Sequence, residues 1–385
     1  MHILYKTLLA IFLLSAIVIF PQDNYSKIES EIRNFLLHRD YSDALEYMND
    51  VSHSIYNEGQ MFLYYGDIYL NADSLRKAVF YYKRAIEKTN SEALMGLGEA
   101  YFREADLTNA KLSFEKYLAV HPDSKDALKY LGQIAIAEQN IGLVENYYMK
   151  IYYIDSTDAE ALLNLGIIYS NSGKYNQAEN FLLKSIKYDA NNPLTYLNIG
   201  ILYGANGKFS KAIEFLNKAL LFDPANEEVY YTVGVFYLLN QNTGEAEISF
   251  NEALQINPDL IDARIGLIIL YEYNHKLEKA QKELDLLSVQ QPGNSQINLL
   301  KANLFYLKEN YVKAIDYTLE AIKADPENPD NFYLLGRLYQ LQGKTSDSEK
   351  AVKNANKLFE NSGKSKSKFN LLKLFSNITN FNNQK

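Results

Sequence analysis

The chain has 385 residues, of which 47% are hydrophobic and 22% charged, and its formal net charge is -8. This length is enough for a large buried core, and the negative charge gives no general attraction to nucleic-acid phosphates. The absence of cysteine excludes disulfides, zinc-thiolate sites, thiol nucleophiles and a lipid-modified N-terminal cysteine.

The N-terminus has the pattern of a secretion signal. Lys6 precedes an uninterrupted apolar or small stretch from Thr7 to Phe20, which is followed by Pro21 and polar residues. The small residues expected before a cleavage site are missing, so an uncleaved membrane anchor is the alternative, although the run is shorter than the ~20 residues that span a bilayer. We therefore expect an exported protein of the periplasm or cell envelope, with residues 1–22 as signal peptide or anchor.

Beyond this segment the sequence repeats every 34 residues. Glycine recurs with this spacing, and Ile268 and Ala302 take the glycine slot where it is skipped. An aromatic residue follows most of these slots three positions later. The glycines are Gly98, Gly132, Gly166, Gly200, Gly234 and Gly336, with Gly66 two residues out of phase. A fixed period of this length indicates a helical-repeat architecture.

Prolines fall with the same spacing, at Pro224, Pro258, Pro292 and Pro326. Proline is disfavoured inside a helix, so these residues mark the connections between helices. On either side of short turns such as Asn206-Gly207-Lys208, apolar residues recur with helical periodicity. Each repeat is therefore predicted to be a pair of amphipathic helices.

One repeat, from Glu227 to Leu260, carries Tyr230, Val233-Gly234, Tyr237, Ala246, Phe250, Ala253 and Pro258. This pattern resembles the tetratricopeptide repeat family. The resemblance implies an all-α, right-handed superhelical solenoid of stacked helix-turn-helix repeats. It covers residues 25–362 as an array of about ten units, which start at Tyr25, Gly59, Ser91, Lys125, Ala159, Pro193, Glu227, Ile261, Ser295 and Pro329.

Small residues in such a stack let neighbouring backbones approach closely, so the glycines are expected to be packing residues. A large side chain at Gly200 should then lower stability by overpacking. The one phosphate-loop-like segment, Gly343-Lys344-Thr345, lacks the earlier glycine and a preceding strand. The five histidines never pair at i, i+4 on one helix face. We expect neither an enzyme nor a cofactor or metal site.

Proteins of this family generally bind extended peptides or partner helices in a concave groove lined by the first helix of each repeat. The resemblance thus implies a protein or peptide partner and not a nucleic acid. The groove slots lie three before and one after each glycine slot, with an asparagine between them in two repeats. The candidate residues are Leu163, Asn164, Ile167, Leu197, Asn198, Ile201, Tyr231, Val235, Ile265 and Ile269.

Lys129, together with Asn164 and Asn198, also matches part of the clamp with which some family members hold a carboxylate. Leu194 stands where a second lysine would be needed, so the clamp is incomplete. Two alternatives to a binding groove remain open. The candidate residues could pack against adjacent helices, or the protein's own C-terminal segment could fill the groove of a membrane-tethered structural spacer.

The C-terminus differs in charge from the rest of the chain. Residues 350–385 contain eight lysines and one acid, Glu360. Apolar residues between Phe369 and Ile378 predict an amphipathic helix there. We expect residues 363–385 to form a basic helix and tail that cap the last repeat, since solenoids need terminal caps. Contact with a membrane surface or an acidic partner is the alternative.

Overall fold

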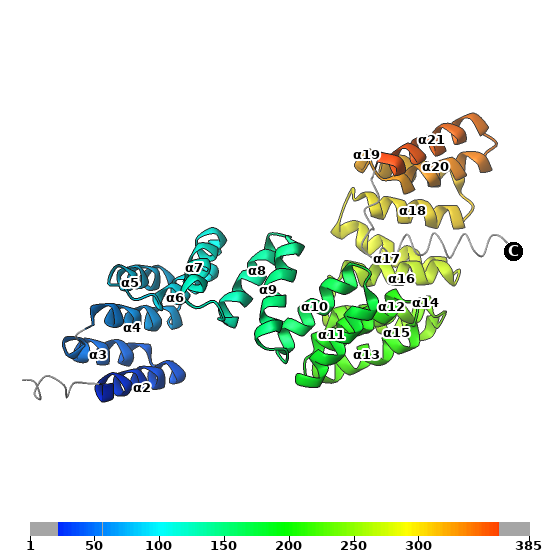
Figure 1. The fold of residues 1–385 in the computed structure, drawn as a ribbon. Coiled ribbons are helices and arrows are strands. Elements are labelled where there is room, and N and C mark those ends of the chain that lie inside the picture. Colours follow the sequence, from blue (N-terminus) through cyan, green and yellow to red (C-terminus); the bar gives the residue numbers. More distant parts are fainter. Residues whose placement is uncertain (1–21, 56, 362–385) are drawn as a thin grey trace, which may run out of the picture. The chain divides into compact units, whose positions relative to one another are not determined.

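The computed structural model describes residues 22–55 and 57–361, and within these ranges it is all-α, with twenty α-helices and one short 3-10 helix (Figure 1). The predicted signal or anchor segment up to residue 21 and the predicted cap at residues 363–385 lie outside the described residues. Across the described part of the chain, no helix is long and apolar enough to cross a membrane.

The chain divides between Ser172 and Gly173 into two compact units, and each unit is described by itself. The first unit contains α2 (Gln22–His38), α3 (Tyr41–Val51), η1 (Ser52–Ser54), α4 (Glu58–Asn71), α5 (Leu75–Glu87), α6 (Ala93–Arg103), α7 (Leu107–Val120), α8 (Lys125–Ala137), α9 (Ile141–Ile154) and α10 (Ala159–Asn171).

The second unit continues the same alternation. It contains α11 (Tyr175–Tyr188), α12 (Pro193–Ala205), α13 (Phe209–Phe222), α14 (Glu227–Leu239), α15 (Thr243–Ile256), α16 (Ile261–Tyr273), α17 (Leu277–Gln290), α18 (Ser295–Leu307), α19 (Tyr311–Ala324), α20 (Pro329–Leu341) and α21 (Thr345–Asn361).

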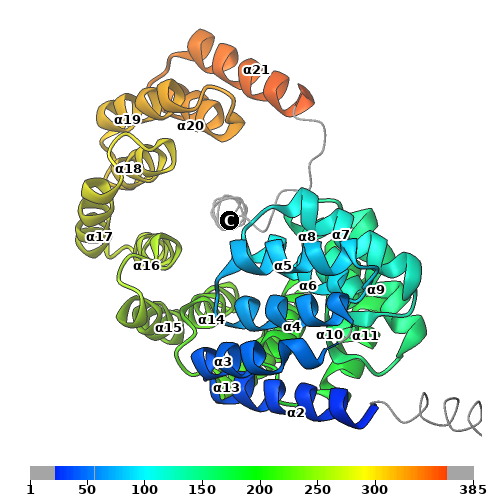
Figure 2. The same ribbon diagram turned by 90° about the vertical axis from the view of Figure 1, so that its left-hand side faces the viewer.

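Even-numbered helices, here called A-helices, open each repeat, and odd-numbered ones, called B-helices, close it. In the second unit each A-helix packs against the B-helices on both sides of it in the chain, and α14 also contacts α12 and α16. Within this unit, α14 and α16 lie on the inner side of an arc and α15 and α17 on its outer side (Figure 2). The expectation of an all-α solenoid of stacked helix pairs is confirmed.

The repeating glycines lie where the two helices of a pair cross. A Cβ atom added at Gly200 would come within 2.6 Å of Leu216 Cγ, and one at Gly234 within 2.7 Å of the Phe250 ring. The same contact, always with the residue sixteen positions later, is made at Gly66, Gly98, Gly132 and Gly336. The prediction that these glycines are packing residues is confirmed.

The turn between the A-helix and B-helix has a fixed backbone geometry. Its left-handed residue recurs every 34 positions, as Gly173, Gly207, Gln241, His275 and Glu309, with φ between 53° and 73°. At the second of these turns the N–H of Lys208 donates to the carbonyl of Tyr203 at 2.9 Å, which closes the helix end. The turn thus holds the same shape whether or not glycine occupies it.

Successive repeats are also tied together by a tyrosine and a glutamate. The Tyr203 hydroxyl donates to Glu179 at 2.5 Å, and the Tyr271 hydroxyl donates to Glu247 at 3.0 Å. In each case the tyrosine lies on an A-helix and the glutamate on the B-helix of the preceding repeat. These bonds fix the register of one repeat on the next.

Candidate functional site

The candidate groove residues fall into both units. Lys129 lies on α8 and Leu163, Asn164 and Ile167 on α10 of the first unit. The second unit carries the remaining candidates on α12, α14 and α16: Leu197, Asn198, Ile201, Tyr231, Val235, Ile265 and Ile269. The structure therefore defines two separate sets of inner-face residues, and each set is considered within its own unit.

Most of the apolar candidates are covered. Five of them are buried, namely Leu163, Leu197, Val235, Ile265 and Ile269. Ile167 and Tyr231 are half-buried. Ile201, with 39% of its surface exposed, is the most accessible apolar residue among the candidates. The repeat pattern suggested a continuous apolar surface, but only a few of these apolar side chains are accessible.

The two asparagines use their amide groups locally. Asn164 Nδ2 donates to the Glu160 carbonyl at 2.9 Å, and Asn198 Nδ2 donates to the Leu194 carbonyl at 2.7 Å. Both bonds return to the preceding turn of the same helix. Each asparagine is half-buried, so a ligand would have to compete with this internal bond for the donor, whereas the amide oxygen remains an acceptor.

Lys129 is part of an ion-pair cluster. Its ammonium lies 3.1 Å from Asp158 and 2.9 Å from Glu160, and Lys125 joins the same cluster at 2.6 Å from Asp155. Although burial opposes its charge, the hydrogen bonds to Glu160 and Asp158 raise the pKa of Lys129. The charge of Lys129 is compensated by two carboxylates, which disfavours the carboxylate-clamp interpretation.

An accessible stripe does run along α12. Leu194 is 52% exposed and Ile201 39% exposed, and half-buried Asn198 lies between them at i, i+4 and i+7 spacing. These positions share one helix face. Leu194 was noted in the sequence as the residue that breaks the clamp pattern, but not as a candidate contact. The sequence could have indicated this contact, because Leu194 is an apolar residue at the second position of a helix, where a polar residue is usual.

Glu272 on α16 is an acidic residue that the repeat pattern did not single out. It is 6% exposed, and its Oε2 accepts a hydrogen bond from Asn303 Nδ2 on α18 at 2.7 Å. Burial raises the pKa of Glu272 to about 8. The sequence could have indicated this residue, because Glu272 lies four residues after the Ile268 slot. The equivalent positions of the neighbouring repeats hold the less polar Leu238 on α14 and Tyr306 on α18.

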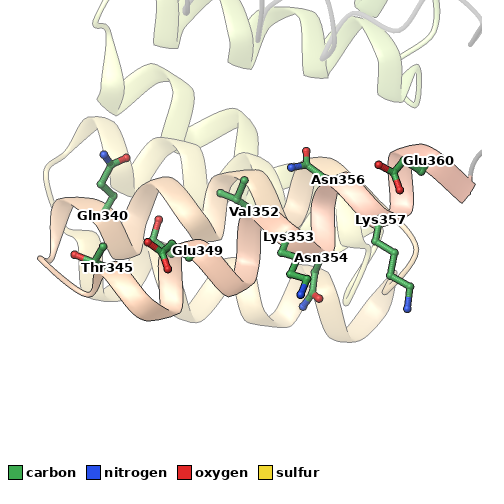
Figure 3. A pocket seen from close by; sticks show the side chains of 10 residues that line it. Gln340, Thr345, Glu349, Val352, Lys353, Asn354, Asn356, Lys357 and Glu360 are labelled. Carbon is green, nitrogen blue, oxygen red and sulfur yellow. The ribbon is translucent and has the colours of Figure 1, made fainter.

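One cavity among the described residues lies on the last helix described, α21. It has a volume of about 860 Å³ and is lined by one side of α21 with Gln340 of α20 (Figure 3). Its lining is polar or charged except for Val352, and includes Glu349, Lys353 and Lys357. Within the described ranges no cluster of three or more histidine, aspartate or glutamate side chains could hold a metal ion.

Family comparisons agree with this architecture. A family model described as the middle TPR-like domain of cilia and flagella-associated protein 70 matches residues 196–360. Two models of the tetratricopeptide repeat match residues 159–192 and 92–124. None of the curated proteins searched matches the chain.

Several solved structures are similar in fold. A tetratricopeptide repeat protein from Parabacteroides merdae ATCC 43184 is 19% identical, with a TM-score of 0.48, over 70% of this chain and 93% of its own. PilF from Pseudomonas aeruginosa is 20% identical, with a TM-score of 0.46, over 52% of this chain and 92% of its own. YrrB, a TPR protein described as having an unusual peptide-binding site, is 17% identical, with a TM-score of 0.41, over 47% of this chain and 95% of its own.

Stacked, register-locked helix pairs with glycine at most of their crossings define an α-helical repeat protein. With the family matches, the chain is a member of the tetratricopeptide repeat family. Repeats of this family generally mediate protein–protein interactions and typically form non-enzymatic scaffolds.

Proposed function

We propose that the protein is a non-enzymatic scaffold of the cell envelope that binds an apolar segment of a partner protein on the inner face of its repeats. The observation that carries this proposal is the stripe of Leu194, Asn198 and Ile201 on α12. Exposed apolar side chains that share one helix face are typical of interaction sites. Asn198 adds an amide oxygen that can accept a hydrogen bond from a ligand backbone.

The partner chemistry follows from the stripe. Two aliphatic side chains seven residues apart contact an apolar surface of about two helical turns, such as one face of an amphipathic helix. No lysine or arginine occupies the stripe, so an acidic or phosphorylated peptide is disfavoured. We therefore expect a partner segment that presents two or three leucine, isoleucine or phenylalanine side chains.

A charge reversal tests the binding surface. The double change Leu194→Glu and Ile201→Glu places two carboxylates in the stripe at exposed positions, so the fold should be retained. The matched control is Ile248→Glu with Leu286→Glu, two residues that are 55% and 54% exposed on the B-helices α15 and α17. A protein that co-purifies from the envelope fraction with the wild type and the control, but not with the stripe variant, would support the proposal.

Equal recovery of that protein with both variants, each showing wild-type circular dichroism, would overturn it. Leu197, another candidate groove residue, is unsuitable for such a test because it is buried. A charge at Leu197 would unfold the repeat regardless of any partner.

Export is a separate part of the proposal and rests on the N-terminal sequence. Sequencing the N-terminus of the mature protein from fractionated cells should give a start near Gln22 in the envelope or periplasmic fraction. Recovery of the intact N-terminus from membranes would instead favour the alternative, a membrane-tethered structural spacer. The burial of five of the candidate groove side chains is the observation that favours this alternative.

A further inference from the structure

Two successive B-helices of the first unit carry opposite charges. Helix α5 contains four basic residues and one acid, which gives a net charge of +3, and no other described helix exceeds +1. Helix α3 contains three acids and no basic residue, which gives a net charge of -3. Both helices pack against α4 (Figure 1). The B-helix side of the first unit therefore carries a basic helix next to an acidic one.

The opposite charges occupy the same slots of the repeat. On each helix, three exposed residues spaced at i, i+3 and i+7 share one face. The acidic row of α3 is Asp43, Glu46 and Asp50, and the basic row of α5, 34 residues later, is Lys77, Phe80 and Arg84. Phe80, at the centre of the basic row, is 53% exposed. Each cation of the basic row thus has a carboxylate as its equivalent in the acidic row.

The cations of the basic row are held in place but not neutralised. The Lys77 ammonium lies 4.9 Å from the centre of the Tyr69 ring, and the Arg84 guanidinium lies 4.7 Å from the centre of the Phe62 ring. These contacts orient the two cations and leave their charge uncompensated. Among the residues that the structure describes, no ion pair involves either row.

A later repeat shows what is missing here. Lys279, which occupies the Lys77 slot on α17, lies 3.0 Å from Glu247 on the preceding B-helix. The equivalent of Glu247 on α3 is Leu45, which cannot pair with Lys77. The acids of α3 stand instead in the outward-facing slots of the acidic row. The first unit therefore has cations and carboxylates that are both available to another molecule.

The presence of both signs restricts the kind of partner. An anionic bilayer or a nucleic acid attracted to α5 would also meet the carboxylates of α3, which repel it. A surface with one row of each sign is instead complementary to a second copy of itself. A twofold axis along the boundary between the two helices would bring α5 of each copy against α3 of the other. Residues of the same slot would then face each other.

We propose that two copies of this chain associate through α3 and α5 of their first units, with the acidic row of each copy against the basic row of the other. Asp43 faces Lys77 of the other copy and Asp50 faces Arg84. Phe80 covers the methylene groups of Glu46. Because the contact is twofold symmetric, each ion pair forms twice in the dimer. The contact uses no residue of the α12 stripe and does not depend on whether that stripe binds a partner.

An exchange of charges between the two rows tests this proposal in the full chain. One variant carries Lys77→Asp with Arg84→Asp, and a second carries Asp43→Lys with Asp50→Arg. Each alone should dimerise with a dissociation constant raised at least about ten-fold, because like charges then face each other. An equimolar mixture of the two variants should dimerise again, since their rows are complementary. The chain with all four changes should dimerise like the wild type.

Analytical ultracentrifugation at low ionic strength measures these equilibria, and added salt should weaken the wild-type dimer by screening. The matched control is Lys282→Asp with Lys323→Asp, which changes the net charge equally at exposed residues of α17 and α19 and should leave dimerisation unchanged. Circular dichroism should show that every variant keeps the wild-type helix content.

Three results would overturn the proposal. The first is a wild type that stays monomeric at about 100 µM, a concentration that populates even a contact with a dissociation constant of ~10 µM. The second is a dimer that persists in both reversed variants, and the third is a mixture of those variants that does not associate. If the wild type is monomeric and sediments with phosphatidylglycerol vesicles, and Lys77→Asp with Arg84→Asp abolishes this, the basic row binds a membrane instead.

Discussion

Where a helix crossing contains glycine, that glycine is the residue on which the stack depends most directly. At Gly200 the nearest atom to an added Cβ is Leu216 Cγ, a branch point close to the backbone, and the Ala212 carbonyl oxygen is 3.1 Å away. Neither can move without shifting a helix. The distance between the two helices of this repeat is therefore set by the absence of a side chain at Gly200.

Gly200→Ala should lower the free energy of unfolding by about 1–3 kcal/mol through overpacking. Gly244→Ala is the matched control, because a Cβ there meets nothing within 4 Å and Gly244 is also helical. Alanine at that site should raise stability by up to about 1 kcal/mol through its higher helix propensity. Chemical denaturation measures both values, and equal effects of the two changes would contradict the packing role of Gly200.

The left-handed turn residue provides a second prediction. Glu309 has a φ of 57°, a conformation that costs an L-residue about 1–2 kcal/mol. Glu309→Gly should relieve this strain, and after the larger chain entropy of glycine is subtracted, stability should rise by up to about 1 kcal/mol. The melting temperature of Glu309→Gly should therefore exceed that of the wild type.

Glu320→Gly is the control for this change, since Glu320 is an exposed residue inside α19. Glycine at such a position lowers stability by roughly 0.5–1 kcal/mol. If both glycine substitutions destabilise the protein, strain at Glu309 is not significant.

At the scale of a single helix, α16 combines inner-face packing with an ionisable group. Its buried residues include Ile265, Ile269 and Glu272. Burial raises the pKa of Glu272 from an ordinary value of 4.5 to about 8. Because the folded state then holds this proton more tightly than the unfolded state, the contribution of Glu272 is complete below about pH 4.5 and is lost as the pH rises toward about 8.

This pH dependence is measured by comparison with a chain that lacks the carboxyl group. The unfolding free energy of the wild type relative to that of the Glu272→Gln chain should fall by up to about 1.4 kcal/mol per pH unit between about pH 5 and pH 8. Denaturation at several pH values measures both, and a stability difference that does not change with pH would contradict the burial of a proton on Glu272.

The repeat period predicted the positions of the helices well, whereas it predicted poorly which groove residues are accessible. Helix α14 begins at Glu227 and α16 at Ile261, the residues at which the 34-residue pattern places new repeats. Glycine spacing predicts these elements because the period of the repeat is constant, even though Ile268 takes the glycine slot of α16. The same reasoning assigned one groove slot to Ile201, Val235 and Ile269, yet Ile201 is 39% exposed and the other two are 3% and 5% exposed.

The difference arises because burial at that slot depends on how closely neighbouring A-helices approach, and periodicity carries no information on that distance. Helix α14 contacts both α12 and α16. Lys129 shows the same limit, since its acidic partners Asp158 and Glu160 lie at the start of α10, the first helix of the following repeat. A sequence pattern defined within one repeat therefore does not predict contacts with residues of the next repeat.

For the molecule as a whole, stability should be the sum of contributions from each repeat and from its contacts with adjacent repeats. The side chain of Phe250 shows why, because it lies between Gly234 of its own repeat and Gly266 of the next. Loss of this ring therefore affects two repeats directly, and more distant repeats only through their neighbours.

Phe250→Ala should lower local stability by roughly 3–5 kcal/mol. Hydrogen exchange should accelerate in α14, α15 and α16, less so in α12 and α18, and remain unchanged in α4 to α8 of the first unit. Val289→Ala, at a residue that is 82% exposed in the same unit, should leave exchange nearly unchanged. Faster exchange throughout both units after Phe250→Ala would show global rather than nearest-neighbour cooperativity.

The central claim is that the inner stripe of α12 holds a partner protein. A photo-reactive phenylalanine analogue placed at Ile201 in living cells tests it directly, with Ile248 on the B-helix α15 as a control position of comparable exposure. We predict one dominant cross-linked protein at Ile201, lost when Leu194→Glu is added, and none at Ile248. The same cross-linked protein at both positions, or persistence of the cross-link in the presence of Leu194→Glu, would contradict it.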